Sequence, residues 1–218
     1  MMHVLLDVGI VLVVWVGLAV VLKWSDHRAV VAVTDVTGYA SLGLILLTLA
    51  IGPWRLLRGK PNPVSSDLTR DLGIAAGVTG VVHVACSFWV HLTTAYPSLA
   101  HRVVHYFSFT GDRKFALANV IGAIALVNLV FLTAISADWA LQGLGRRRWK
   151  QLQRTNYALV VLVLVHTALF WSILARTRRI EILTVVAVGV VLVLQVRGIA
   201  VYRSRRAAGQ VEPEHLEQ

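Results

Sequence analysis

Two histidines lie within long apolar stretches of this chain, His83 in VTGVVHVACSFW and His166 in VVLVLVHTALFW. An imidazole surrounded by hydrocarbon is costly unless something satisfies it, so an ionisable residue within a membrane segment is a functional candidate. Imidazole is also a common iron ligand, and two facing histidines can hold one haem iron from both sides. Either histidine alone is equally compatible with a structural role, whereas the pair predicts the axial ligands of one haem.

The composition indicates a membrane protein. Of 218 residues, 57% are hydrophobic and 15% are charged, whereas a soluble domain has about 25% charged residues. Six apolar runs approach the length that crosses a bilayer, at residues 4–22, 36–54, 72–90, 115–137, 155–175 and 182–203. We expect an all-α integral membrane protein, a six-transmembrane-helix bundle forming one domain over 1–206, with a polar tail over 207–218. Pro53 is expected to end the second helix.

The basic residues give an orientation. The net charge of +10 comes from lysines and arginines that flank the apolar runs, so it indicates a lipid bilayer rather than nucleic acid as the partner. Taking alternate sides of the six runs, 13 basic residues fall on one side and 8 on the other. Cytoplasmic loops carry the excess of positive charge. Both termini are therefore predicted to be cytoplasmic, in a multi-pass protein of the cytoplasmic (inner) membrane.

The two histidines are predicted to lie at the same depth. His83 follows the basic residue Arg70 by 13 positions, and His166 follows Arg154 by 12. The 72–90 and 155–175 segments run in the same direction, so a rise of 1.5 Å per residue places both imidazoles roughly 18–20 Å from those arginines. This matched depth favours ligation of one haem over two separate structural roles.

The remaining histidines are weaker candidates. His91 lies near the outer end of its helix, where an interfacial position explains it. His101 and His105 have the i, i+4 spacing that can chelate a metal on a helix. No carboxylate or cysteine clearly completes such a site. We favour an interfacial amphipathic turn with Tyr106 and Phe107 at the lipid headgroups.

Three features near His83 and His166 have two interpretations each. Small residues in the third helix allow close helix packing or leave room for a flat macrocycle: Gly73, Ala76, Gly77 and Gly80. Cys86, the single cysteine, excludes an intrachain disulfide and is interpreted as a small core residue rather than a cofactor contact. Trp89 and Trp171 either line the cofactor pocket or anchor the helices at the interface.

Several motifs resemble a known family. The segment TGYASLGLILLTLAIGPWRLL is similar to the entry helix of the ferric reductase-like transmembrane domain family. Further similarity follows in TRDLGIAAGVTGVVH, FALANVIGAIALVNLVFLTAIS and LGRRRWKQLQRTNYALVVLVLVH. The order and spacing of these motifs over residues 37–171 most resemble the haem-binding membrane subunits of the bacterial methionine sulfoxide reductase system.

The resemblance implies a membrane b-type cytochrome that passes electrons across the bilayer through haem. His83 and His166 align with the ligands of the haem nearer the outer face. Gln153 stands where family members have a histidine associated with a haem nearer the cytoplasm. Because glutamine is not a normal haem ligand, we expect one haem b per chain and a second haem that is absent or held differently.

We therefore expect an electron-transfer subunit with one bis-histidine haem between the third and fifth helices, and no catalytic domain of its own. A flavin domain and a nucleotide-binding glycine motif are missing from the sequence. Separate partners must then supply and accept the electrons, the donor being a quinol or a flavoprotein and the acceptor a protein. The alternative is a structural or assembly subunit in which haem is secondary or lost. A third alternative, a small transporter, would need carboxylates within the membrane. Asp7, near a membrane edge, is the carboxylate that comes closest to such a position, so the sequence gives this alternative little support.

Overall fold

The described part of the chain is built from helices. The computed structural model describes residues 27–60, 67–92, 98–174 and 178–209, and these contain no strand. The helices are α2 (His27–Leu57), α3 (Asp67–Leu92), α4 (Leu99–Phe107), α5 (Arg113–Ile135), α6 (Asp138–Gln153), α7 (Thr155–Ile173) and α8 (Arg178–Ala207).

Five stretches are long and apolar enough to cross a membrane: Val30–Leu57, Leu68–Val90, Arg113–Ile135, Arg147–Ile173 and Arg178–Ala207. Each contains most of one segment predicted from hydropathy. The described part of the chain is therefore all-helical, and the chain is a multi-pass membrane protein, as expected. The predicted 4–22 helix lies outside the described residues, so the count of six, the orientation of the termini and the single domain over 1–206 stay predictions.

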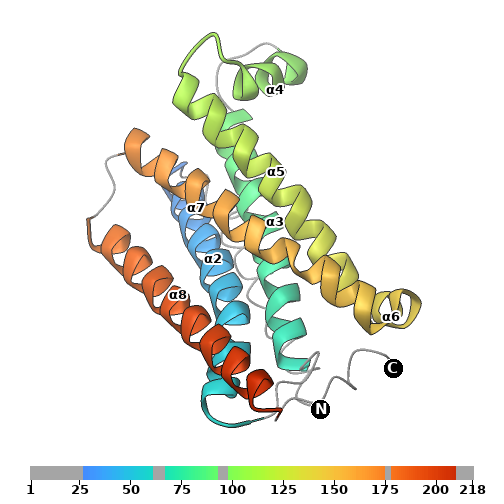
Figure 1. The fold of residues 1–218 in the computed structure, drawn as a ribbon. Coiled ribbons are helices and arrows are strands. Elements are labelled where there is room, and N and C mark those ends of the chain that lie inside the picture. The colour runs from blue at the N-terminus through green and yellow to red at the C-terminus, as the bar shows by residue number, and fades with distance from the viewer. Residues whose placement is uncertain (1–26, 61–66, 93–97, 175–177, 210–218) are drawn as a thin grey trace.

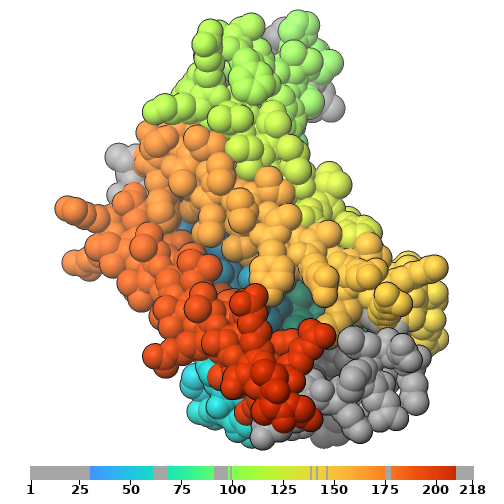
Figure 2. Space-filling model, in the orientation of Figure 1, coloured from blue at the N-terminus to red at the C-terminus, as the bar shows by residue number. Residues whose placement is uncertain are grey.

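Two helix pairs dominate the packing. The most extensive contacts join α2 to α3 and α5 to α7, while α8 packs on α2, and α3 also contacts α5. The short helix α4 lies at one end of the bundle and α6 at the other (Figure 1). On the face shown in Figure 2, α7 and α8 lie in front, and α2 is visible between them. The interior of the bundle therefore lies between the α2–α3 pair and the α5–α7 pair.

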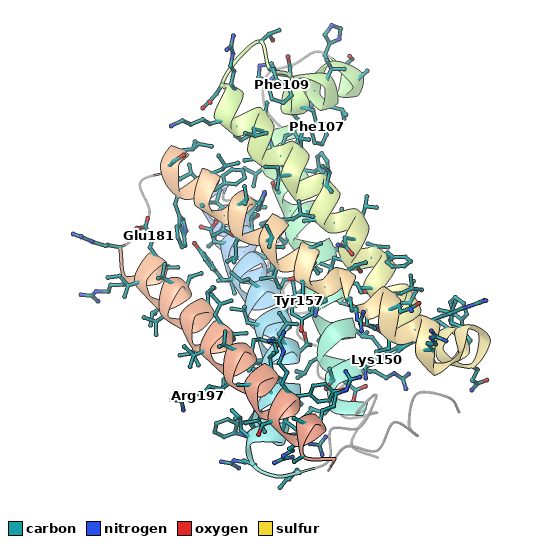
Figure 3. All side chains as sticks on the ribbon, viewed as in Figure 1. Phe107, Phe109, Lys150, Tyr157, Glu181 and Arg197 are labelled. Carbon is teal, nitrogen blue, oxygen red and sulfur yellow. The ribbon has the colours of Figure 1, made fainter. Side chains whose placement is uncertain are left out.

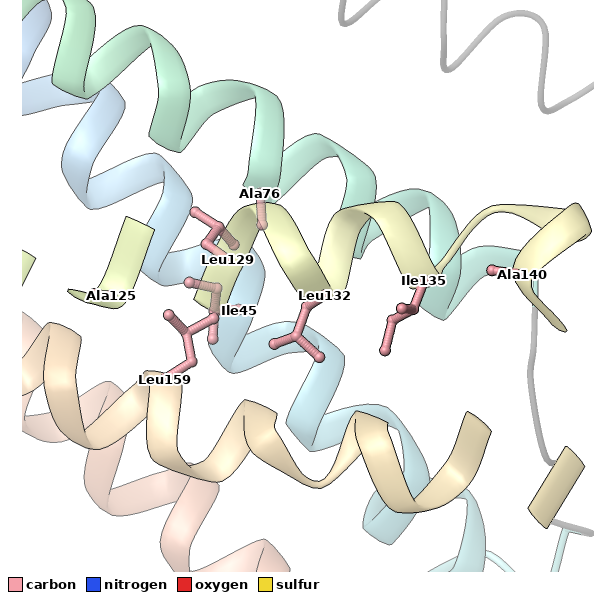
Figure 4. Close-up of a cluster of buried hydrophobic side chains, with 8 residues drawn as sticks. All are labelled: Ile45, Ala76, Ala125, Leu129, Leu132, Ile135, Ala140 and Leu159. Atoms are coloured by element: carbon pink, nitrogen blue, oxygen red, sulfur yellow. The ribbon is translucent and has the colours of Figure 1, made fainter. Parts of the chain in front are cut away.

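The largest buried hydrophobic cluster of the described residues lies on the α6 side of the bundle's middle. Its side chains come from five helices and form one buried cluster (Figure 4): Ile45, Ala76, Ala125, Leu129, Leu132, Ile135, Ala140 and Leu159. At Gly145, φ is +70°, a left-handed conformation that glycine adopts without steric cost, and it bends α6. Beyond the bend, the indole Nε1 of Trp149 donates to the carbonyl oxygen of Ile135 at 2.8 Å. The second half of α6 is thus fixed against the end of α5.

Helix α2 begins earlier than its apolar run. We expected 36–54, and the helix starts at His27. The hydroxyls of Thr34 and Thr37 donate to the carbonyl oxygens of Val30 and Val33, four residues earlier, at 2.8 and 2.7 Å. Because the helix itself satisfies these polar side chains, they are tolerated within it although they lower its hydropathy.

The prediction that Pro53 ends this helix is wrong, since α2 continues to Leu57. Proline lacks the N–H that would bond to the carbonyl of the residue four positions earlier, Leu49. Here Gln195 of α8 replaces that donor, and its Nε2 lies 2.9 Å from the Leu49 oxygen. Gly198 allows α8 this approach, because a Cβ on it would lie 2.9 Å from Cβ of Pro53.

Replacing Gln195 by Leu is expected to lower the free energy of unfolding by roughly 0.5–2 kcal/mol, the range found for side-chain hydrogen bonds between membrane helices. The substitution removes the bond to Leu49 and the bond that Gln195 accepts from the Tyr157 hydroxyl at 3.4 Å. Thermal unfolding in detergent measures the change. The matched control is Gln151→Leu on exposed α6 surface, and equal stability of the two variants would contradict this account of Pro53.

Candidate functional site

The fold brings His83 and His166 together. His83 comes from α3 and His166 from α7, and their ring centroids lie 6.3 Å apart with the ring planes at 88°. Both side chains lie in the wall of one cavity of about 580 Å³. The two helices thus place the imidazoles at the same level of the bundle, facing a shared space.

A main-chain carbonyl fixes each imidazole. Nδ1 of His83 donates to the carbonyl oxygen of Thr34 in α2, and Nδ1 of His166 donates to that of Ala118 in α5, both at 2.8 Å. A carbonyl oxygen only accepts, so in both neutral rings the proton lies on Nδ1. The lone pair of each Nε2 is then available to a metal, and the hydrogen bond at Nδ1 sets the orientation of the ring.

A glycine makes room for each of these hydrogen bonds. Gly38 and Gly122 lie one helical turn after Thr34 and Ala118. A Cβ on Gly38 would lie 2.8 Å from Nδ1 of His83, and one on Gly122 would lie 2.7 Å from Nδ1 of His166. Any other residue at either position would push the ring away from its carbonyl. Sequence reasoning missed both glycines, although each is a glycine inside an apolar helix near the depth of a histidine.

The distance between the rings suits one metal ion. An imidazole nitrogen lies about 2 Å from a transition metal that it binds, so two rings sharing one metal have centres about 6 Å apart. The observed 6.3 Å agrees with this arrangement. The cavity volume of about 580 Å³ also falls within the roughly 300–1,000 Å³ of small-molecule and cofactor sites. The residues present therefore fit a haem between His83 and His166.

One polar atom of a residue that lines the cavity has no hydrogen-bond partner among the described residues. Asn119 lines the cavity, and its Nδ2 donates to the carbonyl oxygen of Tyr106 at 3.0 Å. Its Oδ1 is buried and has no hydrogen-bond partner within the described structure. An unsatisfied buried oxygen is costly, and a bound group or an ordered water commonly accounts for it.

Aromatic residues form the wall towards α4. Phe170 lies 5.0 Å from the ring of His166, and Trp171 donates from Nε1 to the hydroxyl of Tyr39 at 3.0 Å, between α7 and α2. Trp171 therefore lines the cavity, whereas Trp89 is 59% exposed and is not part of the wall.

Asp35, on the part of α2 that hydropathy left out, also lines the cavity. It is an intramembrane carboxylate that the sequence argument overlooked.

The small residues of α3 serve mainly for helix packing. A Cβ on Gly77 would collide with the Thr133 side chain of α5. A Cβ on Gly80 would collide with the Leu129 side chain, which is also on α5. Of the four, only Gly80 lies in the wall of the large cavity. Cys86 is 9% exposed, in a buried cluster with Val30 and Val90 and away from the cavity wall, so it is a core residue.

The other histidine pair is exposed on α4. Nδ1 of His101 hydrogen-bonds to Oγ of Ser98 at 2.9 Å, and His105 projects to the surface. No group of three metal-binding side chains occurs in the described ranges, so the structure completes no metal site at this pair. The side chain of His91 lies outside what the structure describes.

The aromatic residues of α4 point inwards and line the large cavity. Tyr106 packs on Phe88 of α3 with ring centroids 5.0 Å apart, and Phe107 lies near them at the same end of the bundle (Figure 3). Burial raises the pKa of the Tyr106 hydroxyl, which therefore stays protonated and shares a hydrogen bond with Oγ of Ser87 at 3.0 Å. Helix α4 thus closes the cavity at this end.

Gln153 lines a second cavity, of about 200 Å³, at the α6 end of the bundle. Its Nε2 donates to Oγ of Ser136 at 3.3 Å. The volume is below the roughly 300 Å³ at which cofactor sites begin, and the described wall contains no histidine. The residues at this end therefore do not fit a second haem.

Replacing Gly38 by Ala is expected to destabilise the protein, because the new methyl group displaces the His83 ring from the Thr34 carbonyl. The matched control is Gly43→Ala on the same helix, where a Cβ meets nothing within 4 Å. That change should stabilise the helix by roughly 0.5–1 kcal/mol. Thermal unfolding of both variants is the measurement, and two shifts of the same sign would contradict the role given to Gly38.

Comparison with known proteins identifies several relatives that share a name. No protein-family model and no solved structure matches the chain. Curated relatives are named protein-methionine-sulfoxide reductase heme-binding subunit MsrQ. That of Bordetella pertussis is 33% identical over 138 residues, covering 63% of this chain and 59% of the relative. That of Azospira oryzae is 29% identical over 146 residues, covering 66% and 58%.

A third MsrQ, from Polaromonas naphthalenivorans, is 27% identical over 151 residues, covering 68% of this chain and 63% of the relative. The chain thus spans less than two thirds of the length of these relatives. The name of these relatives agrees with the family that the motifs of residues 37–171 resemble. The similarity of this chain to the haem-binding membrane subunits of methionine sulfoxide reductase systems is therefore confirmed.

Proposed function

We propose that this protein is a membrane b-type cytochrome that transfers electrons through one haem b held by His83 and His166 between α3 and α7. The observation that carries the proposal is the matched pair of imidazoles. Each has Nδ1 bound to a carbonyl, and the ring centres lie 6.3 Å apart across a cavity. The relatives' name, which describes haem-binding subunits, supports the same cofactor.

The residues around the histidines prepare them for this role. The carbonyl oxygens of Thr34 and Ala118 hold each ring in the tautomer that presents Nε2 to the cavity and increase the basicity of that nitrogen. The largely apolar walls exclude water and provide a low dielectric around the site. A haem bound here would supply one-electron chemistry, and with His83 and His166 both serving as its ligands the site would favour electron transfer over oxygen activation.

A single haem restricts the route of the electrons. Because the cavity beside Gln153 does not fit a second macrocycle, a donor must approach the one haem directly. A membrane quinol, or a donor protein at the α4 end, satisfies this requirement better than a flavoprotein at the α6 end. The relatives are named as subunits of a reductase, so the acceptor is a separate protein, for which we propose a methionine sulfoxide-reducing partner.

The bundle is proposed to lie in the cytoplasmic membrane with its α6 end on the cytoplasmic side. That end carries Arg55, Arg70 and Lys150, whereas the aromatic residues of α4 lie at the other end. An excess of basic residues marks the cytoplasmic side of membrane proteins. The large cavity, which α4 closes, then lies nearer the outer face.

The purified protein is expected to give low-spin b-type bands in a reduced-minus-oxidised spectrum, with one haem per chain. His83→Ala and His166→Ala should each abolish these bands, because each removes one ligand. His101→Ala and His105→Ala are the matched controls, since both side chains are exposed on α4, and they should retain the full haem content.

Two haems per chain would contradict the single site. Haem that survives the loss of both His83 and His166 would contradict the assigned ligands. Protein without haem, although made with ample haem supply, would overturn the electron-transfer proposal and leave the structural-subunit alternative.

A further inference from the structure

Five aromatic rings form a continuous series from α4 to the proposed haem ligand on α7. The series begins on α4 with Phe107, labelled in Figure 3, and Tyr106, whose ring centroids lie 5.0 Å apart. Tyr106 lies 5.6 Å from Phe115 of α5, and Phe115 lies 6.0 Å from Phe170 of α7. Phe170 lies 5.0 Å from the imidazole of His166. This ring series therefore connects three helices at the α4 end of the bundle.

Successive rings of the series meet edge to face. Their planes are inclined to one another at 79°, 78°, 81° and 65°, in order from Phe107 to His166. An aromatic ring has a negative face and a positive edge, so such pairs attract at centroid separations of about 4.5–7 Å. Because the edge of each ring lies against its neighbour in a close-packed interior, one ring cannot turn without displacing the next. A change in one ring is therefore passed along the series.

The ring series reaches only one of the two cavity histidines. Among the described rings, His83 has only His166 as an aromatic neighbour, whereas His166 also contacts Phe170. The hydrogen bond from Nδ1 to the Ala118 carbonyl holds the His166 ring at one point, and the ring of Phe170 packs against it at another. The plane of the His166 imidazole therefore depends on the ring series, and that of His83 does not.

Phe115 is the member of the series that lies outside the cavity. The other four rings line the large cavity, whereas Phe115 is not part of its wall. Phe115 lies in the first turn of α5, where Oδ1 of Asp112 accepts hydrogen bonds from the main-chain N–H groups of Lys114 and Phe115 at 2.9 and 3.3 Å. A substitution of Phe115 therefore reaches the cavity only through the residues around it.

The α4 end of the series is fixed to two other helices. The Tyr106 hydroxyl shares a hydrogen bond with Oγ of Ser87 on α3, and the Tyr106 carbonyl oxygen accepts from Nδ2 of Asn119 on α5, both at 3.0 Å. The Tyr106 ring also packs on Phe88 of α3 at 5.0 Å. The position of α4 on the bundle therefore determines where the series begins.

We propose that Tyr106, Phe115 and Phe170 are positioning residues for His166, because their rings transmit the packing of α4 to the plane of its imidazole. The proposal rests on the proposed function in one respect, namely that His166 is a haem ligand. Residues that orient a metal ligand also tune the metal that it binds. A shift of α4 therefore acts on the haem site through His166 and leaves His83 in place.

The test follows the Nδ1–H groups of the two histidines by nuclear magnetic resonance. The full chain, labelled with nitrogen-15 histidine, is purified in detergent and kept reduced, because a low-spin ferrous haem, where one is bound, is diamagnetic. The two signals are assigned by their loss in His83→Ala and His166→Ala. The measurement gives a result with or without haem.

Phe115→Leu should shift the His166 signal and leave the His83 signal unchanged, because it removes a ring from the series. Tyr106→Leu, one ring further away, should shift the His166 signal by a smaller amount. Phe115→Tyr retains the ring and should keep the spectrum of the intact protein. The matched control is Phe131→Leu, on the same helix, 39% exposed and outside the series, and it should shift neither signal.

In the haem-bound protein, Phe115→Leu should also reduce the anisotropy of the low-spin ferric signal in electron paramagnetic resonance, and Phe115→Tyr should retain it. An unchanged His166 signal in Phe115→Leu, an equal shift of the His83 signal, or the same shift in Phe131→Leu overturns the positioning role. An intact protein without haem overturns the cytochrome proposal alone, since the histidine signals still test the ring series.

Discussion

The hydrogen bond from each buried imidazole to a main-chain carbonyl of a neighbouring helix is the interaction on which this structure depends. A histidine in an apolar bundle needs a partner for Nδ1. Thr34 provides it for His83, and Ala118 provides it for His166. The ring reaches that carbonyl only where the facing helix has a glycine one turn later. The same device occurs twice, once in α2 with α3 and once in α5 with α7, and these are the two most extensive helix contacts of the described chain. The same contacts between helices therefore determine both how the helices pack and where the two histidines lie.

The two ends of the bundle have opposite chemistry as a result. Towards α4, the interior is large and mostly apolar, and both imidazoles lie in its wall, which suits a flat, hydrophobic cofactor held by nitrogen ligands. Towards α6, the interior is small, polar and cationic, with Gln153 in its wall. The absence of a histidine at position 153 and the small volume agree with each other. Both agree with the proposal of one haem per chain.

The helices were largely predictable, because a membrane segment must be apolar over its whole length and hydropathy detects that directly. The convergence of His83 and His166 was also predictable, since equal distances from the helix starts imply equal depth. The errors share a cause. Hydropathy began the α2 run at residue 36 because Thr34 and the charged Asp35 lower it, and it does not see that the Thr34 hydroxyl bonds within its own helix. Hydropathy also does not predict that Gln195, which is distant in sequence, supplies the hydrogen-bond donor that Pro53 lacks. Gly38 and Gly122 were missed for the same reason, as their role exists only between helices.

The most direct test of the histidine pair as haem ligands is the low-temperature electron paramagnetic resonance spectrum of the oxidised protein. Two imidazoles on one iron give a low-spin ferric signal, and perpendicular ring planes, here at 88°, make that signal strongly anisotropic. The account predicts this signal from a single low-spin haem in the intact protein and its loss in His83→Ala and His166→Ala. A high-spin ferric signal as the main species of the intact protein would show that the two histidines do not hold the iron together, and would contradict the central claim.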